Sequence, residues 1–176
     1  MKKMHVYSHT HWDYEWYFTA SESIIQLIYH MDEVISALES GTLKTYLLDS
    51  QVSILEEYLH MMPEKEPVIR KLVEEGKLMI GPWYTQSDEL IISGESLARN
   101  LWYGISYARE LGNCMMIGYL PDSFGHSWDF PKIFHQFGIK DFVITRGVGD
   151  DYKLGSEFYM KSNDGSELLV CTMIAG

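Results

Sequence analysis

Residues 8–16, SHTHWDYEW, place two histidines, two acidic residues and two tryptophans in one segment that follows a short apolar run. Side chains two residues apart point the same way in an extended segment, so His9, His11 and Asp13 can share one face. Imidazole nitrogens and carboxylate oxygens are ligands that zinc takes in proteins. A HxHxD stretch on its own is more often a hydrogen-bonded loop, and a divalent-metal site is the alternative interpretation that the spacing allows.

A second polar cluster, PDSFGHS, occupies residues 121–127. Asp122 in this cluster is the best candidate for a third ligand, and a three-ligand zinc site keeps one position open for a substrate oxygen. His126 in the same cluster fits either the site or a hydrogen bond to a neighbouring carbonyl. Arg146 fits either the site or a surface ion pair.

Other polar and aromatic residues have two interpretations each. Trp12 and Trp16 fit core or rim packing, but an indole face beside polar ligands is also a platform for a sugar ring. Asp88 and Glu89 fit capping of the next helix, orientation of the rim, or contact with a ligand. Four histidines away from these clusters are interpreted as structural: His5, His30, His60 and His135.

Alternating strands and helices are predicted to position these side chains. Apolar periodicity and capping signals predict helices over residues 19–40, 51–61, 64–75, 95–111 and 130–137, and strands over residues 4–8, 45–48, 78–83, 114–120 and 141–145. Two further strands, 157–161 and 167–173, flank the turn-rich SNDGS and predict a hairpin. Strand–helix alternation implies a parallel sheet with helical crossovers.

Ligands of such sheets bind at the carboxyl ends of the strands. The polar clusters follow the first, third, fourth and fifth predicted strands, so we expect them to meet on one rim.

Composition narrows the class of protein. The chain has 176 residues, 46% hydrophobic and 14% aromatic, which is typical of a globular domain. Its formal charge of −11 disfavours nucleic acid as a partner. Cys114 and Cys171 lie in apolar runs without CxxC spacing, which predicts buried thiols rather than a disulfide. We find no apolar stretch of membrane-spanning length and no signal peptide in the sequence, so we expect no membrane partner and a cytoplasmic location.

Four blocks in register resemble one known family. HTHWDYEW, GKLMIGPWYTQSDE, IGYLPDSFGHS and FGIKDFVITRG, in this order and spacing, are similar to the N-terminal catalytic domain of the glycoside hydrolase family 38 α-mannosidases. The resemblance covers nearly the whole chain. It implies an α/β fold, a seven-stranded parallel β/α barrel of the glycosidase and deacetylase type, of which residues 1–176 would form the N-terminal part of a longer chain.

The resemblance also assigns roles to individual residues. It implies that His11, Asp13 and Asp122 are ligands of one divalent ion, with zinc the usual metal, and that Asp122 is also the catalytic nucleophile. It implies that Trp16 lines the floor of the mannose site and that Arg146 lies near the nucleophile as a substrate-binding residue. By the same resemblance Phe124 is a pocket aromatic and His9 shapes the site without binding the metal.

Retaining hydrolysis of an α-mannosidic bond is the implied reaction, and it needs a second carboxylic acid about 5 Å from the nucleophile. That acid and a fourth metal ligand, a histidine, are expected beyond Gly176. We therefore expect these residues alone to bind metal weakly and to be almost inactive.

The implied partner is a mannose-containing small glycoside or oligosaccharide. The blocks TASES and LLDSQVSILEEYL are closer to the bacterial cytoplasmic branch, which includes hydrolases of mannosylglycerate and its phosphorylated form; α-mannose cleaved from N-glycan pieces is the other substrate considered. The alternatives to a glycosidase are a metal-dependent carbohydrate deacetylase and a non-catalytic carbohydrate-binding barrel. Association into a homo-oligomer is left open.

Overall fold

Three parallel strands form the first sheet of the computed structural model, which describes residues 5–173. They are β1 (Ser8–Thr10), β2 (Tyr46–Leu48) and β3 (Leu78–Met79), and they lie in the order β1-β2-β3. In register, His9 pairs with Leu47, and Leu47 pairs with Met79. Because all three strands run the same way, the loops that follow them leave from the same edge of the sheet.

The second sheet contains the remaining strands in the order β4-β5-β7-β6. They are β4 (Gly118–Leu120), β5 (Asp141–Ile144), β6 (Glu157–Lys161) and β7 (Glu167–Thr172). Strands β4, β5 and β7 are parallel, whereas β6 and β7 pair antiparallel. The hairpin predicted around SNDGS is therefore confirmed.

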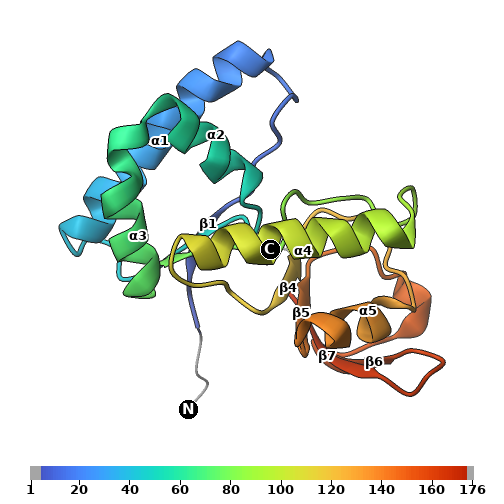
Figure 1. Cartoon of the computed structure of the whole chain (residues 1–176). Helices are drawn as coiled ribbons and strands as arrows, with labels where there is room; N and C mark the ends of the chain where they lie inside the picture. Colours follow the sequence, from blue (N-terminus) through green and yellow to red (C-terminus); the bar gives the residue numbers. More distant parts are fainter. Residues whose placement is uncertain (1–4, 174–176) are drawn as a thin grey trace.

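Within residues 5–173, five α-helices connect and cover the strands (Figure 1). They are α1 (Ala20–Glu39), α2 (Ser53–Met61), α3 (Glu66–Glu74), α4 (Gly94–Glu110) and α5 (Phe130–Phe137), with short 3-10 turns at Pro63–Lys65 and Asp150–Tyr152. Helices α1, α2 and α3 lie together beside the first sheet, and α5 lies against the second (Figure 1). Helix α4 extends between these two groups.

Helix α1 begins where its sequence signal predicts. The Thr19 hydroxyl accepts from the Glu22 amide, and the Glu22 carboxylate accepts from the Thr19 amide at 2.9 Å, so the capping box is complete. The buried side chains of the helix recur at helical spacing: Leu27, Met31, Val34, Ile35 and Leu38.

Three strands have a boundary that differs from the prediction by more than one residue. The first strand is Ser8–Thr10 rather than 4–8, of which residue 4 lies outside the described part. The third stops at Met79, because Gly81 adopts a left-handed backbone (φ +74) and Pro82 has no N–H to donate to a ladder. The fourth begins at Gly118 rather than at residue 114.

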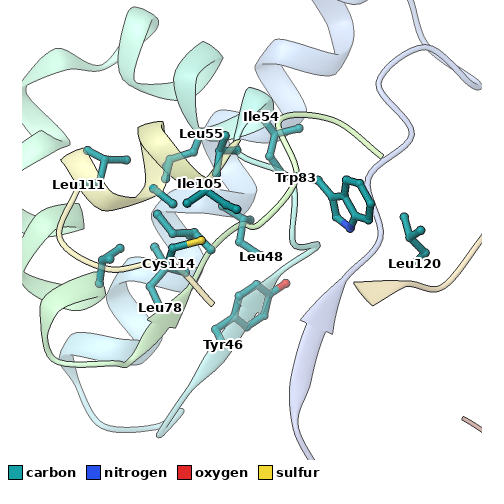
Figure 2. Packing of buried hydrophobic residues seen from close by; sticks show 14 of the residues in the cluster. Tyr46, Leu48, Ile54, Leu55, Leu78, Trp83, Ile105, Leu111, Cys114 and Leu120 are labelled. Atoms are coloured by element: carbon teal, nitrogen blue, oxygen red, sulfur yellow. The ribbon is translucent and has the colours of Figure 1, made fainter. Parts of the chain in front are cut away.

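One apolar core connects the two sheets and the helices. Figure 2 shows Leu48, Leu78, Ile105 and Cys114 gathered between strands and helix α4, with the Trp83 indole lying toward Leu120. Trp83 is fully buried. The segment after β3 is thus packed from both sides, which fixes the loop that leads to the rim.

Polar contacts also join the sheets. The carbonyl of Tyr119 in β4 accepts from Ser50 Oγ at 2.9 Å and from the Trp83 indole N–H at 3.2 Å. The Met115 amide donates to the Ile80 carbonyl at 2.8 Å. The first sheet therefore meets the second along the β3–β4 side.

Both cysteines are free thiols. Burial raises the pKa of Cys114 to about 11, so this thiol is protonated at neutral pH and unreactive. Cys171 is half-buried, so the prediction of two buried thiols holds for Cys114 and only in part for Cys171. Within residues 5–173, no helix is both long enough and apolar enough to cross a membrane.

Phenylalanine in place of Tyr58 is expected to lower the free energy of unfolding by about 1 kcal/mol. The fully buried Tyr58 donates its hydroxyl to Asp32 at 3.0 Å, which ties α2 to α1, and the variant removes this bond without emptying the core. Urea unfolding measures the change. Tyr29→Phe, at a largely exposed position on α1, is the matched control; equal stability of the two variants would contradict the prediction.

Candidate active site

The two sequence clusters meet at the carboxyl ends of β1 and β4. His11 Nε2 lies 3.5 Å from Asp13 Oδ1 and 3.5 Å from Asp122 Oδ2. One donor atom from each of the three residues lies within 4.8 Å of the others. The structure therefore brings together the three residues that the sequence predicts as a metal site.

His9 is not part of this group. Its Nδ1 lies 3.1 Å from the Tyr119 hydroxyl. The expectation that it binds no metal stays a prediction.

A buried carboxylate lies behind His11. Asp49 is fully buried directly after β2, and its Oδ1 accepts from His11 Nδ1 at 3.1 Å. Because a carboxylate only accepts, the proton of the neutral imidazole is on Nδ1. Nε2, on the cluster side, is then a bare acceptor.

The fit of a metal ion can be tested on His11 itself. Nε2 is buried and has no hydrogen-bond partner among the described residues, although two carboxylates lie nearby. A buried polar atom without a partner is costly, and a bound cation would satisfy it. Imidazole nitrogen and carboxylate oxygen are both donors that zinc takes in proteins, so the residues present fit this ion.

The pKa of His11 is raised from its ordinary value. The hydrogen bond to Asp49 is the largest cause; burial and the charge of Arg146 act in the opposite direction, and the charges of Asp49 and Asp13 raise the pKa further. Three carboxyl groups lie around His11 against the guanidinium of Arg146, an excess of acidic groups that favours a cation.

Arg146 lies against Asp122. Its guanidinium donates to Asp122 Oδ1, while the other carboxylate oxygen faces His11. The guanidinium carbon lies 4.3 Å from the centroid of the exposed Phe124 ring, within cation–π range. Asp122 is therefore held between a cation on one side and the candidate metal site on the other.

The side chain of His126 holds the backbone of Arg146. His126 Nε2 lies 2.8 Å from the Arg146 carbonyl and Nδ1 lies 3.3 Å from Glu89 Oε1, with the side chains of His126 and Glu89 both buried. The alternative that His126 bonds a neighbouring carbonyl is thus the one observed. Of the three interpretations given for Glu89, orientation of the rim agrees with this contact, because Glu89 holds His126 and His126 holds the Arg146 carbonyl.

The remaining predicted residues lie in hollows around the cluster. Trp16, 68% exposed, lines an open hollow of about 360 Å³ together with His11 and Asp13. Asp88 lines a neighbouring open hollow of about 160 Å³ with Asp122. Trp12 lines the same hollow as Trp16 and also stacks on His30, whose Nε2 lies 3.0 Å from the Tyr46 hydroxyl.

Asp49 and Gln86 were missed by the sequence analysis. Gln86 donates its amide to both the side chain and the carbonyl of Asp49, at 2.8 and 2.6 Å. The signal was present: Asp49 directly follows the second predicted strand, as the other polar clusters follow theirs.

Residues 1–175 match the sequence profile described as "Glycosyl hydrolases family 38 N-terminal domain". The chain belongs to glycoside hydrolase family 38. A family relative from Halalkalibacterium halodurans, named "Putative mannosylglycerate hydrolase", is 36% identical over 181 residues, covering 96% of this chain and 20% of the relative. "Alpha-mannosidase F" of Dictyostelium discoideum is 28% identical over 173 residues, covering 92% of this chain and 16% of its own.

A solved family structure has the same fold. The crystal structure of an α-mannosidase from Enterococcus faecalis V583 superposes with a TM-score of 0.88 at 33% identity, over 95% of this chain and 19% of that one. The mixed α/β fold with parallel sheets is therefore that of family 38. The chain spans about a fifth of the length of these relatives.

Proposed function

We propose that this chain supplies the nucleophile and metal-binding half of a retaining, zinc-dependent α-mannosidase active site. The observation that carries the proposal is the convergence of His11, Asp13 and Asp122 in a chain of family 38, where His11 Nε2 is buried and has no hydrogen-bond partner among residues 5–173. The proposal extends to the fold: the two sheets, joined at Tyr119, would be the first part of a seven-stranded β/α barrel.

His11, Asp13 and Asp122 would hold the ion. A zinc ion bound there supplies Lewis acidity and a binding position for sugar hydroxyls. His11 and Asp13 orient the group and contribute one negative charge.

Asp122 would attack the anomeric carbon of the mannoside. In retaining hydrolysis the carboxylate forms a bond to this carbon as the bond to the leaving oxygen breaks, and water later releases the sugar. The proton for the leaving oxygen comes from a second carboxylic acid, a role that we assign to no residue between 5 and 173. Arg146 holds Asp122 Oδ1, which fixes the direction of the attacking carboxylate.

Trp16 and Phe124 would bind the sugar. Both rings are more than half exposed in the hollows beside the cluster, where an aromatic face can pack against the apolar face of a pyranose. We propose a small mannoside of the mannosylglycerate type as substrate, supported by the name of the 36% identical relative. Comparing kcat/KM of the full-length natural protein on mannosylglycerate, its phosphorylated form and an aryl α-mannoside tests this choice; equal or better use of acetylated sugars would favour a deacetylase instead.

Zinc titration of the chain is the direct test of the site. We expect one equivalent to bind, and His11→Ala and Asp122→Ala each to weaken binding by more than about 100-fold, since loss of even an outer partner of a ligand costs 10–100-fold. Competition with a chromophoric chelator measures the affinity. His60→Ala, at an exposed position of α2, is the control for surface binding. Equal zinc uptake by all four proteins would show that the two clusters share no metal.

A further inference from the structure

The Asp49 carboxylate is surrounded by hydrogen-bond donors. Oδ1 accepts from His11 Nδ1 at 3.1 Å and from Gln86 Nε2 at 2.8 Å. Oδ2 accepts from the Trp12 amide at 2.8 Å and from Gln51 Nε2 at 2.7 Å. The side chain is fully buried, so no water competes for these positions. Because four donors point at its two oxygens, the side chain at this position has to act only as an acceptor, as a carboxylate does.

These donors come from three different loops. His11 and Trp12 follow β1, Gln51 follows β2 together with Asp49 itself, and Gln86 follows β3. The carboxylate therefore ties together the three loops that leave the first sheet at the rim. The backbone at this position is also constrained, because Asp49 (φ 41) and Ser50 (φ 53) both lie in the left-handed region.

The bond to His11 decides where the imidazole proton lies. With Nδ1–H donated to Asp49, the neutral ring presents the Nε2 lone pair to the space between Asp13 and Asp122. A metal ligand needs this lone pair, and the partner of the other ring nitrogen commonly selects the tautomer.

We propose that Asp49 is the positioning residue of the metal site: it fixes the tautomer and the ring orientation of His11 and so makes Nε2 a ligand. The proposal rests on the proposed function, because it assigns to Asp49 a task that matters only if His11 binds a metal. Asp49 itself lies behind the ring and touches neither metal nor substrate.

Asparagine at position 49 separates positioning from simple structural support. The side chain keeps its shape but offers one acceptor oxygen, and its amide can donate to His11 Nδ1. The ring proton then moves to Nε2, where it occupies the ligand position. An inverted tautomer of this kind is what an aspartate-to-asparagine change produces beside the histidine of a Ser-His-Asp triad.

The first readout is zinc affinity of the purified chain at fixed pH. We expect Asp49→Asn to weaken binding by about 10–100-fold, the usual cost of losing the outer partner of a histidine ligand. Asp32→Asn is the matched control, since Asp32 also accepts a side-chain hydrogen bond, from Tyr58, but lies on α1 away from the site. Its zinc affinity should equal that of the wild type, and thermal unfolding reports the fraction folded in each variant.

The second readout needs no metal. Long-range proton–nitrogen correlation spectra of the ¹⁵N-labelled, zinc-free chain, at a pH where the ring is neutral, reveal which nitrogen of His11 carries the proton; His11→Ala assigns the signals. We expect Nδ1–H in the wild type and Nε2–H in Asp49→Asn.

The outcomes distinguish this proposal from the proposed function. If Asp49→Asn binds zinc as tightly as the wild type, or if the wild-type His11 carries its proton on Nε2, the role of Asp49 is overturned and the proposed metal site is unaffected. A wild type that binds no zinc overturns the metal site, and the spectra still decide whether Asp49 sets the proton. If Asp49→Asn does not fold, the wild-type spectrum alone remains decisive.

Discussion

Asparagine in place of Asp122 is expected to lower α-mannoside turnover by the full-length natural protein by a factor of about 10⁴ or more, the usual range for removing a catalytic nucleophile. The amide nitrogen that replaces one oxygen is not nucleophilic toward the anomeric carbon, and the negative charge that would favour an oxocarbenium-like transition state is lost. Steady-state kinetics on an aryl α-mannoside measure the change.

Zinc concentration separates the two roles assigned to Asp122. If the residue were only a ligand, saturating zinc would restore kcat in Asp122→Asn; if it is also the nucleophile, kcat stays low when the site is full. Asp141→Asn is the control, because Asp141 is an exposed aspartate at the far end of β5, the strand that leads to Arg146. Recovery of kcat with zinc would remove Asp122 from the chemical step.

Alanine at Gly104 is expected to lower the free energy of unfolding by about 3 kcal/mol or more, at the upper end of overpacking effects. A Cβ there would lie 2.2 Å from the Trp83 carbonyl carbon, 2.3 Å from the Pro82 carbonyl oxygen and 2.4 Å from the Tyr84 amide nitrogen. All three are backbone atoms of a buried segment, so no side-chain rotation relieves the clash. Urea unfolding tests the prediction.

Gly94, the first residue of the same helix, provides the control. A Cβ at Gly94 meets nothing within 4 Å, and alanine is the better helix former, so Gly94→Ala should leave stability unchanged or slightly raised. Similar stability of the two alanine variants would mean that α4 does not press on the Trp83 segment as closely as the structure places it.

Most elements of this fold were predictable because their signals are local. The Thr19–Glu22 capping box marks the start of α1, and Gly138, in the left-handed conformation, marks the end of α5. The strand ends were less predictable. Apolar residues continue after Met79, but Gly81 and Pro82 turn the chain out of the ladder while its side chains stay buried. The chain stays buried there although it no longer pairs as a strand. Hydrophobicity alone cannot distinguish a buried strand from a buried loop.

In the candidate site too, the residues with a local sequence signal were predictable and the others were not. His11, Asp13 and Asp122 were predictable because their side chains are of types that bind metals and because they directly follow predicted strands in the sequence. Asp49 carries no such motif, and its importance depends on four donors from three loops. Contacts of that kind arise only from tertiary structure. The assignment of Trp16 as a sugar platform stays a prediction.

The three candidate ligands do not belong to one sheet. His11 and Asp13 follow β1 in the first, and Asp122 follows β4 in the second, so an ion shared by them would cross-link two halves that also meet through the core and through hydrogen bonds such as those to the Tyr119 carbonyl. Ion binding and folding would then be linked: at a free zinc concentration 100 times the dissociation constant, the bound state gains about 2.7 kcal/mol of stability. By the same linkage, substitutions that loosen the joint at Tyr119 would reduce zinc affinity without touching a ligand.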